Sequence, residues 1–249
     1  MADPAQELPE LPPRLDQAIL DPLLTRDQLQ ALCDSGMQEG VRAICTTPRQ
    51  LPLLRERIGT TDAGPLLVAA IGFPFGAIPA ELKLAEAEWC ATQGAQELDV
   101  VPDFSALANG DSGTFAEELA ALCELGVPVR AVLDMARLES EQLELAVEAA
   151  IDAGAAGLQT SNGFGPACHA DQILQLKQLT RKRCAIKAAG GIHSLSHAGE
   201  LLLAGPICWE PAARRLCCRP SDAPRPEWQN DASPDSPSRW APWASTTAC

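Results

Sequence analysis

The stretch ESEQLELAVEAAIDAGAAGLQTSNGFG (residues 139–165) contains the repeating unit that decides the fold. Residues 139–152 follow a helical pattern, Gly154 stands where a left-handed residue commonly closes a helix, and residues 157–160 form a short strand pattern. A glycine-containing turn comes next. A helix, a glycine and a short apolar strand in this order predict one unit of an α/β fold.

The same unit recurs roughly every 25–30 residues along the chain. Most of the predicted strands are near-continuous apolar runs, which is typical of parallel strands covered on both faces. They span residues 15–19, 41–45, 66–71, 97–101, 129–133, 157–160 and 184–188. Strands of this kind joined by helices indicate either a (β/α)₈ TIM barrel or a doubly wound sheet.

Polar residues at the ends of the predicted strands favour the barrel. Asp99, Asp134, Thr160 and Lys187 fall at or just before the carboxyl ends of strands, where barrel enzymes keep their chemistry. No Gly-x-Gly-x-x-Gly follows the first strand, which disfavours a dinucleotide-binding sheet. We therefore expect an α/β TIM barrel, incomplete because seven strands are recognisable before Gly205.

Composition divides the chain into three parts. We expect a disordered N-terminus over residues 1–10, the barrel over residues 11–205, and a disordered tail unrelated to it over residues 206–249. The tail holds eight of the 21 prolines and four of the five tryptophans. Shifted by one base, the codons of residues 208–212 would encode Leu, Gly, Thr or Ala, and a set that includes Ser, a sequence typical of an eighth strand and a phosphate-binding turn. A frameshift and a natural extension both stay open, and the coding DNA decides between them.

Charge and composition exclude several classes of partner. The net charge of −14 argues against a nucleic-acid partner, because binding to a duplex requires clustered Lys and Arg. No apolar run approaches the roughly 18–20 residues that cross a bilayer. The ten cysteines include no Cys-x-x-Cys pair, and the N-terminus lacks the basic and apolar segments of a secretory signal. We expect free thiols and a cytoplasmic protein without nucleic-acid or membrane partners.

One lysine stands inside a predicted strand. Lys187 is enclosed by small and apolar residues, so its side chain must point into the barrel or lie unpaired in a core, which is costly. A desolvated lysine near another charge can act as a nucleophile or as an acid or base. By contrast, Lys83 is expected at the surface of a helix over residues 79–93, in which Leu82, Leu84, Ala85 and Trp89 lie near one side.

Asp99 is the expected partner of Lys187. Strand alternation puts Glu97, Asp99 and Val101 on one face, and a barrel interior that carries two acids needs a cation. An Asp–Lys pair can relay protons to a carbonyl substrate. A purely structural salt bridge stays open as the alternative reading.

Two glycine-bearing turns follow the last two predicted strands. Residues 160–165 and 189–191 could each present backbone N–H groups to an anion, and late strands are the usual place for phosphate in a barrel. His193 and His197 have a spacing that would suit a metal pair, but no carboxylate or cysteine companion is evident. We expect a phosphate-binding rim, no metal, and a surface histidine pair.

These motifs together resemble the deoxyribose-phosphate aldolase family, over about 195 residues. The segments occur in the family's order: Leu15-Asp16, Ala43-Ile44-Cys45, IGFPFG (residues 71–76), ELD (97–99), LQTSNGFG (158–165) and IKAAGGI (186–192). The last two motifs carry most of the specificity.

The resemblance implies an enzyme that cleaves 2-deoxy-D-ribose 5-phosphate to D-glyceraldehyde 3-phosphate and acetaldehyde without metal or cofactor. In the family, a lysine forms an imine with the substrate, and a second lysine and an aspartate relay protons. Carried over, Asp99 is the relay acid and Lys187 the second lysine. The implied substrate and phosphate pocket is lined by Asp16, Cys45, Thr160, Ser161, Gly163, Gly190 and Gly191.

The chain departs from the family pattern at one decisive position. Gln159 stands where the family keeps its imine-forming lysine, and an amide cannot form an imine. The family's eighth-strand phosphate turn is not recognisable either. Three outcomes stay open: imine formation by Lys187, binding of a sugar phosphate without cleavage, or an inactive gene product. We expect weak activity or none, and whether the chain is a homo-oligomer stays open.

Overall fold

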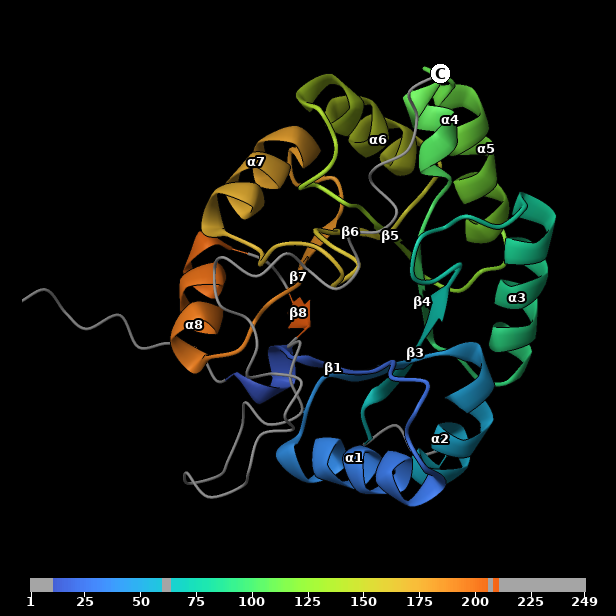
Figure 1. Cartoon of the computed structure of the whole chain (residues 1–249), viewed down its shortest axis with the longest axis vertical. Coiled ribbons are helices and arrows are strands. Elements are labelled where there is room, and N and C mark those ends of the chain that lie inside the picture. The colour runs from blue at the N-terminus through green and yellow to red at the C-terminus, as the bar shows by residue number, and fades with distance from the viewer. Residues whose placement is uncertain (1–10, 60–63, 206–207, 211–249) are drawn as a thin grey trace, which may run out of the picture. The chain divides into compact units, whose positions relative to one another are not determined.

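The computed structural model describes residues 11–59, 64–205 and 208–210 (Figure 1). In this part of the chain, parallel strands form one sheet in sequential order. They are β1 (Asp16–Ile19), β2 (Ala43–Thr46), β3 (Leu66–Ile71), β4 (Glu97–Val100), β5 (Val129–Val132), β6 (Gly157–Gln159), β7 (Ala185–Ala189) and β8 (Cys208–Glu210). The sheet curls until β8 lies next to β1, so the predicted TIM-barrel fold is confirmed.

The expectation of a missing eighth strand is wrong. The backbone of Cys208–Glu210 pairs in parallel with β7, with Lys187 opposite Cys208 in the register. A strand of three residues needs backbone hydrogen bonds to a neighbour and no apolar pattern of its own, so composition does not reveal it. The predicted N-terminal segment and the tail from residue 211 onward lie outside the described residues.

Helices connect the strands and cover the outside of the sheet (Figure 1). They are α1 (Arg26–Glu39), α2 (Leu51–Ile58), α3 (Ala80–Thr92), α4 (Phe104–Ala108), α5 (Ser112–Cys123), α6 (Ser140–Asp152), α7 (Ala170–Thr180) and α8 (Leu195–Ala204), with 3-10 turns at Pro12–Arg14 and Pro48–Gln50. Thr25 caps α1 in a capping box with Gln28, and Gly154 has the left-handed φ of 93° that lets the chain leave α6 for β6. No described helix combines the length and the apolar character that crossing a membrane requires.

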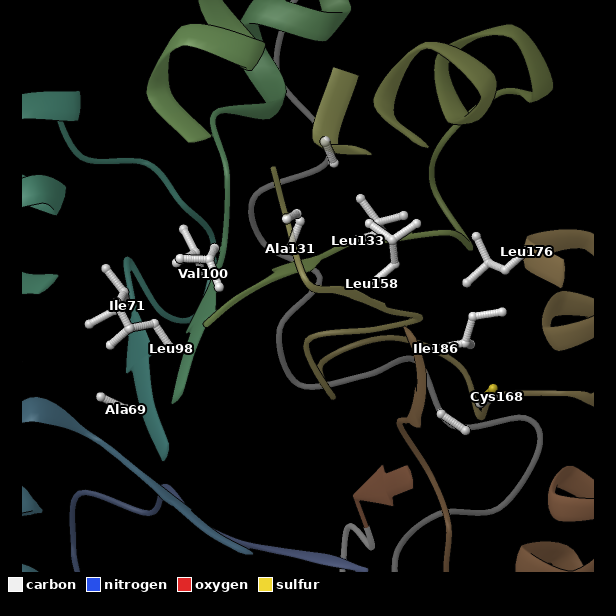
Figure 2. Packing of buried hydrophobic residues seen from close by; sticks show 14 of the residues in the cluster. Ala69, Ile71, Leu98, Val100, Ala131, Leu133, Leu158, Cys168, Leu176 and Ile186 are labelled. Atoms are coloured by element: carbon white, nitrogen blue, oxygen red, sulfur yellow. The ribbon is translucent and has the colours of Figure 1, made fainter. Parts of the chain in front are cut away.

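Strand alternation separates an apolar layer from the interior of the barrel. Outward side chains such as Leu98, Val100, Leu158 and Ile186 pack beneath the helices in one core (Figure 2). A small inner cluster of Ala43, Cys45, Val68 and Ala70 lies on the other face of β2 and β3. The neighbours of the outward residues therefore point into the barrel. This places Asp99, Gln159 and Lys187 in its interior.

Candidate active site

Within the described residues, six charged side chains meet in and beneath the barrel interior, three acids and three bases: Asp16, Arg42, Glu97, Asp99, Arg130 and Lys187. They come from β1, β4, β5, β7 and the residue that precedes β2. Their formal charges cancel. Buried charges are tolerated when they are paired and hydrogen-bonded, as these are.

The two arginines hold the acids in place. Arg42 donates to both oxygens of Asp16, at 2.6 Å each, and to both oxygens of Glu97, at 2.7 and 2.9 Å. Arg130 donates to Asp99 at 2.5 Å and to Glu97 at 2.9 Å. Because a guanidinium presents its donors in a fixed fork, these contacts fix the orientation of all three carboxylates.

Lys187 completes the network, and its side chain is fully buried. Its Nζ lies 2.7 Å from Oδ2 of Asp99 and 3.1 Å from Oδ2 of Asp16. The structure thus brings together the pair that strand alternation predicted, and it adds Asp16 as a second carboxylate. Two carboxylates at these distances favour the ammonium form of the lysine.

The network keeps its acids ionised. Burial acts to raise the pKa of Asp16, but Lys187, Arg42 and Arg130 outweigh it and lower that pKa to about 2. For Asp99, the opposing effect of burial is likewise overcome by Arg130 and Lys187, so its pKa lies below the ordinary value. The pKa of Glu97 is lowered against burial by Arg42 and Arg130. All three acids are carboxylates at neutral pH.

Gln159 lies beside Lys187, its partner in the register between β6 and β7. The side chain is only 4 % exposed. Its Nε2 donates to the backbone carbonyl of Ser161 at 2.7 Å. Its Oε1 has no hydrogen-bond partner among the described residues. The position that the resemblance assigns to an imine-forming lysine is therefore filled by a buried, half-satisfied amide.

The two predicted phosphate-binding turns lie next to each other at the ends of β6 and β7. A Cβ on Gly190 would approach Oγ of Ser161 to 3.0 Å, and one on Gly191 would meet Cα of Ala167 at 2.7 Å. Both glycines have positive φ, 98° and 66°, so a side chain would be strained there as well. Ser161 Oγ accepts from the N–H of Gly163 at 3.0 Å. The turns thus bring Ser161, Gly163, Gly190 and Gly191 to one rim.

Two other predicted pocket residues have structural partners. Thr160 Oγ1 donates to the carbonyl of Ala189 at 3.0 Å and accepts from its N–H at 2.9 Å, so this hydroxyl joins β6 to the end of β7. The thiol of Cys45 lies 3.7 Å from Oδ2 of Asp99. Asp16, predicted at the pocket, lies inside the network described above.

The surface placement of Lys83 is wrong. Lys83 on α3 is fully buried, and its Nζ donates to Oε1 of Glu118 at 2.7 Å. Leu82 and Trp89, which were expected near one side of this helix, are 58 % and 43 % exposed. The helix turns a face of small residues and Lys83 inward, because Glu118 on α5 compensates the buried charge.

The sequence reading also missed the two arginines of the network. Arg130 stands inside an apolar strand, the same signal that singled out Lys187, and it could have been found in that way. Arg42 lies just before β2, and its side chain binds Asp16 on β1 and Glu97 on β4. Only the curvature of the sheet brings it to them.

The sequence is similar to those of known deoxyribose-phosphate aldolases. No protein-family model matches the chain. A deoxyribose-phosphate aldolase of Thermosynechococcus vestitus is 37 % identical over 200 residues, which cover 80 % of this chain and 91 % of that protein. One from Thermococcus kodakarensis is 32 % identical over 196 residues, covering 77 % of this chain and 88 % of the relative.

Solved structures of aldolases are also similar to this chain. The chain resembles "QR15, an Aldolase" with a TM-score of 0.78 and 27 % identity, over 82 % of this chain and 92 % of that one. It resembles the tetrameric deoxyribose phosphate aldolase from Aeropyrum pernix with a TM-score of 0.73 and 27 % identity, over 82 % of this chain and 87 % of that one.

Proposed function

We propose that this chain, which belongs to the deoxyribose-phosphate aldolase family, binds 2-deoxy-D-ribose 5-phosphate and cleaves it to D-glyceraldehyde 3-phosphate and acetaldehyde. The observation that carries the proposal is the buried contact of 2.7 Å between Lys187 Nζ and Asp99 Oδ2. Of the four lysines in the sequence, all within the described residues, Lys187 is the one that points into the barrel. The neighbouring glycine turns after β6 and β7 lie together at one rim, and we expect the phosphate to bind there.

The reaction needs one amine and one proton relay. Asp99 accepts a proton from Lys187, and the neutral amine attacks C1 of the open-chain aldehyde. Asp99 then returns the proton, so that water leaves and a protonated imine forms. A base removes the proton of the 3-hydroxyl while the C2–C3 bond breaks, and the electron pair of that bond moves into the protonated imine. The glyceraldehyde 3-phosphate leaves, the remaining enamine is protonated at C2, and water hydrolyses it to acetaldehyde and free Lys187.

The same network makes the first step unfavourable. The pKa of Asp99 is lowered, so this carboxylate is a weak base, and Asp16 also stabilises the ammonium form of Lys187. We therefore expect slow turnover.

Gln159 favours a second candidate function, binding of the sugar phosphate without cleavage. Its amide occupies the place beside Lys187 where the family pattern has the imine-forming lysine, and it is buried there. A barrel that retains its phosphate-binding turns and lacks this amine would still bind the substrate.

Borohydride trapping separates the two candidates. The full chain is incubated with 2-deoxyribose 5-phosphate or acetaldehyde and sodium borohydride, and the modified residue is located by peptide mass spectrometry. An adduct on Lys187, absent from the Lys187→Met variant, supports cleavage. No adduct together with thermal stabilisation by the sugar phosphate supports binding alone. If neither occurs, both candidates are wrong.

The expected setting of this activity is cytoplasmic. Five of the described cysteines, Cys33, Cys90, Cys123, Cys168 and Cys184, are free thiols, which is typical of proteins from a reducing compartment. A small sugar phosphate is the proposed partner, and a role in deoxyribonucleotide and carbohydrate catabolism follows from the reaction. A homo-oligomer stays a prediction, and the relative from Aeropyrum pernix, a tetramer, is in keeping with it.

A further inference from the structure

Three buried side-chain atoms lack a hydrogen-bond partner within the part of the chain that the structure describes. They are Oε1 of Gln17, Nε of Arg55 and Oε1 of Gln159. Buried polar atoms in folded proteins are nearly always paired, so each of these needs an explanation. Gln159 differs from the other two, because its side chain points into the barrel. Gln17 faces the helices, and Arg55 lies on α2.

The orientation of the Gln159 amide is determined by its neighbour. The atom that lies 2.7 Å from the carbonyl oxygen of Ser161 must be the nitrogen, because two acceptors at that distance would repel each other. The unpaired atom is therefore the oxygen, which can only accept a hydrogen bond. Whatever pairs with it must be a donor.

The place of this oxygen specifies which part of a ligand meets it. Gln159 lies beside Lys187 in the register, while its outward neighbour Leu158 packs in the outer core (Figure 2). The glycine turns that suit a phosphate follow β6 and β7, closer to the rim. A sugar phosphate with its phosphate on these turns would direct its other end, C1, toward Gln159.

We propose that Gln159 makes this site selective for a sugar phosphate with a hydroxyl group at C1, and this inference rests on the proposed binding of a deoxyribose phosphate. An aldehyde oxygen can only accept hydrogen bonds, so it leaves Oε1 unpaired. The hydroxyl of a ring-closed hemiacetal or of an alditol donates to Oε1. Gln159 thereby favours the ring-closed form of the sugar over the open-chain aldehyde that reacts with an amine.

The test uses a pair of ligands that differ by one hydroxyl group and cannot form an imine. Binding of 2-deoxy-D-ribitol 5-phosphate and of its 1-deoxy analogue to the full chain is measured by isothermal titration calorimetry. We expect the C1 hydroxyl to tighten binding by about three- to tenfold, the range for one net hydrogen bond. The Gln159→Met variant should bind both ligands equally.

Gln17 offers a matched control. Its Nε2 also donates to a backbone carbonyl, that of Leu32 at 3.2 Å, and its Oε1 is also unpaired within the described residues, but it lies outside the barrel. The Gln17→Met variant should keep the preference for the C1 hydroxyl. Thermal melting of both variants establishes that they are folded.

The outcomes separate this inference from the proposed function. Equal binding of both alditols to the wild-type chain overturns the role of Gln159, whether or not the variants fold, and leaves the sugar-phosphate site intact. Binding of 2-deoxyribose 5-phosphate without binding of the alditols overturns it as well, as does a preference that survives Gln159→Met. No binding of any of the three sugar phosphates overturns the proposed function together with the inference.

Discussion

Lys83 and Lys187 are both fully buried, and each lies 2.7 Å from a carboxylate oxygen, yet their surroundings differ. Lys83 lies between α3 and α5 and pairs with Glu118, which also accepts from the N–H of Asp103 at 3.1 Å. Lys187 lies inside the barrel, where it pairs with Asp99 and Asp16. These two carboxylates also pair with two arginines. The first pair joins α3 to α5, and Glu118 also binds the loop after β4. The second belongs to a charge-balanced network beside the glycine turns.

The comparison teaches that burial and an ionic partner do not by themselves mark a reactive lysine. Both lysines satisfy those conditions. What distinguishes Lys187 is that its side chain points from β7 into the barrel. It lies beside the amide of Gln159, of which only the nitrogen is paired, and near two turns that can bind an anion. Substitutions at Gln159, Lys83, Lys187 and Asp16 test that distinction.

The first prediction introduces another buried lysine, Gln159→Lys, next to Lys187. The positive charge of Lys187 should favour the neutral amine at position 159, and the variant should raise the retro-aldol rate on the order of 10³- to 10⁴-fold. The rate is measured by coupled detection of glyceraldehyde 3-phosphate. A borohydride adduct should move to position 159. An unchanged rate in a folded variant would show that the glutamine is not what limits catalysis.

The second prediction concerns the buried positive charge of Lys83 between α3 and α5. Lys83→Met leaves Glu118 buried without its cation, and the free energy of unfolding should fall by about 3–5 kcal/mol. Denaturation in urea measures the loss. The double variant Lys83→Met, Glu118→Leu should recover most of it, because both charges are then gone. A loss below about 1 kcal/mol would contradict the structural role assigned to this pair.

The third prediction concerns the lysine of the barrel. Lys187→Met should cost less stability than Lys83→Met, about 1–3 kcal/mol, because Asp99 keeps Arg130 and Asp16 keeps Arg42. It should abolish any borohydride adduct at this position. Urea denaturation and mass spectrometry give the two readouts. If it cost more stability than Lys83→Met, the arginines would not be compensating the acids.

The fourth prediction is a loss of stability in acid. The pKa of Asp16 is lowered from 3.8 to about 2 in the folded chain, so its contribution is complete above pH 3.8 and is lost as the pH falls through about 2. That contribution is on the order of 2 kcal/mol. Urea denaturation between pH 5 and pH 2 should show a smaller loss for Asp16→Asn. Parallel curves for the two proteins would contradict the assignment.

Much of the fold follows from local pattern. Apolar strand runs, helical periodicity and glycines after helices predict the order of the elements, since each is a property of residues adjacent in the sequence. Alternation along the 97–101 strand also predicts that Asp99 points inward. The eighth strand, Cys208–Glu210, is not recognisable in this way, because its pairing depends on the edge that β7 offers.

Local pattern predicts the barrel and the inward Asp99 and Lys187, and it identifies the glutamine at position 159. Three features depend on the folded chain: Asp16, Arg42 and Arg130 join Lys187 in one network, Lys83 is buried, and one oxygen of Gln159 has no partner among the described residues. The physical reason is distance. Periodicity acts between near neighbours, whereas ionic partners such as Asp99 and Lys187 are 88 residues apart and meet only when the sheet curls.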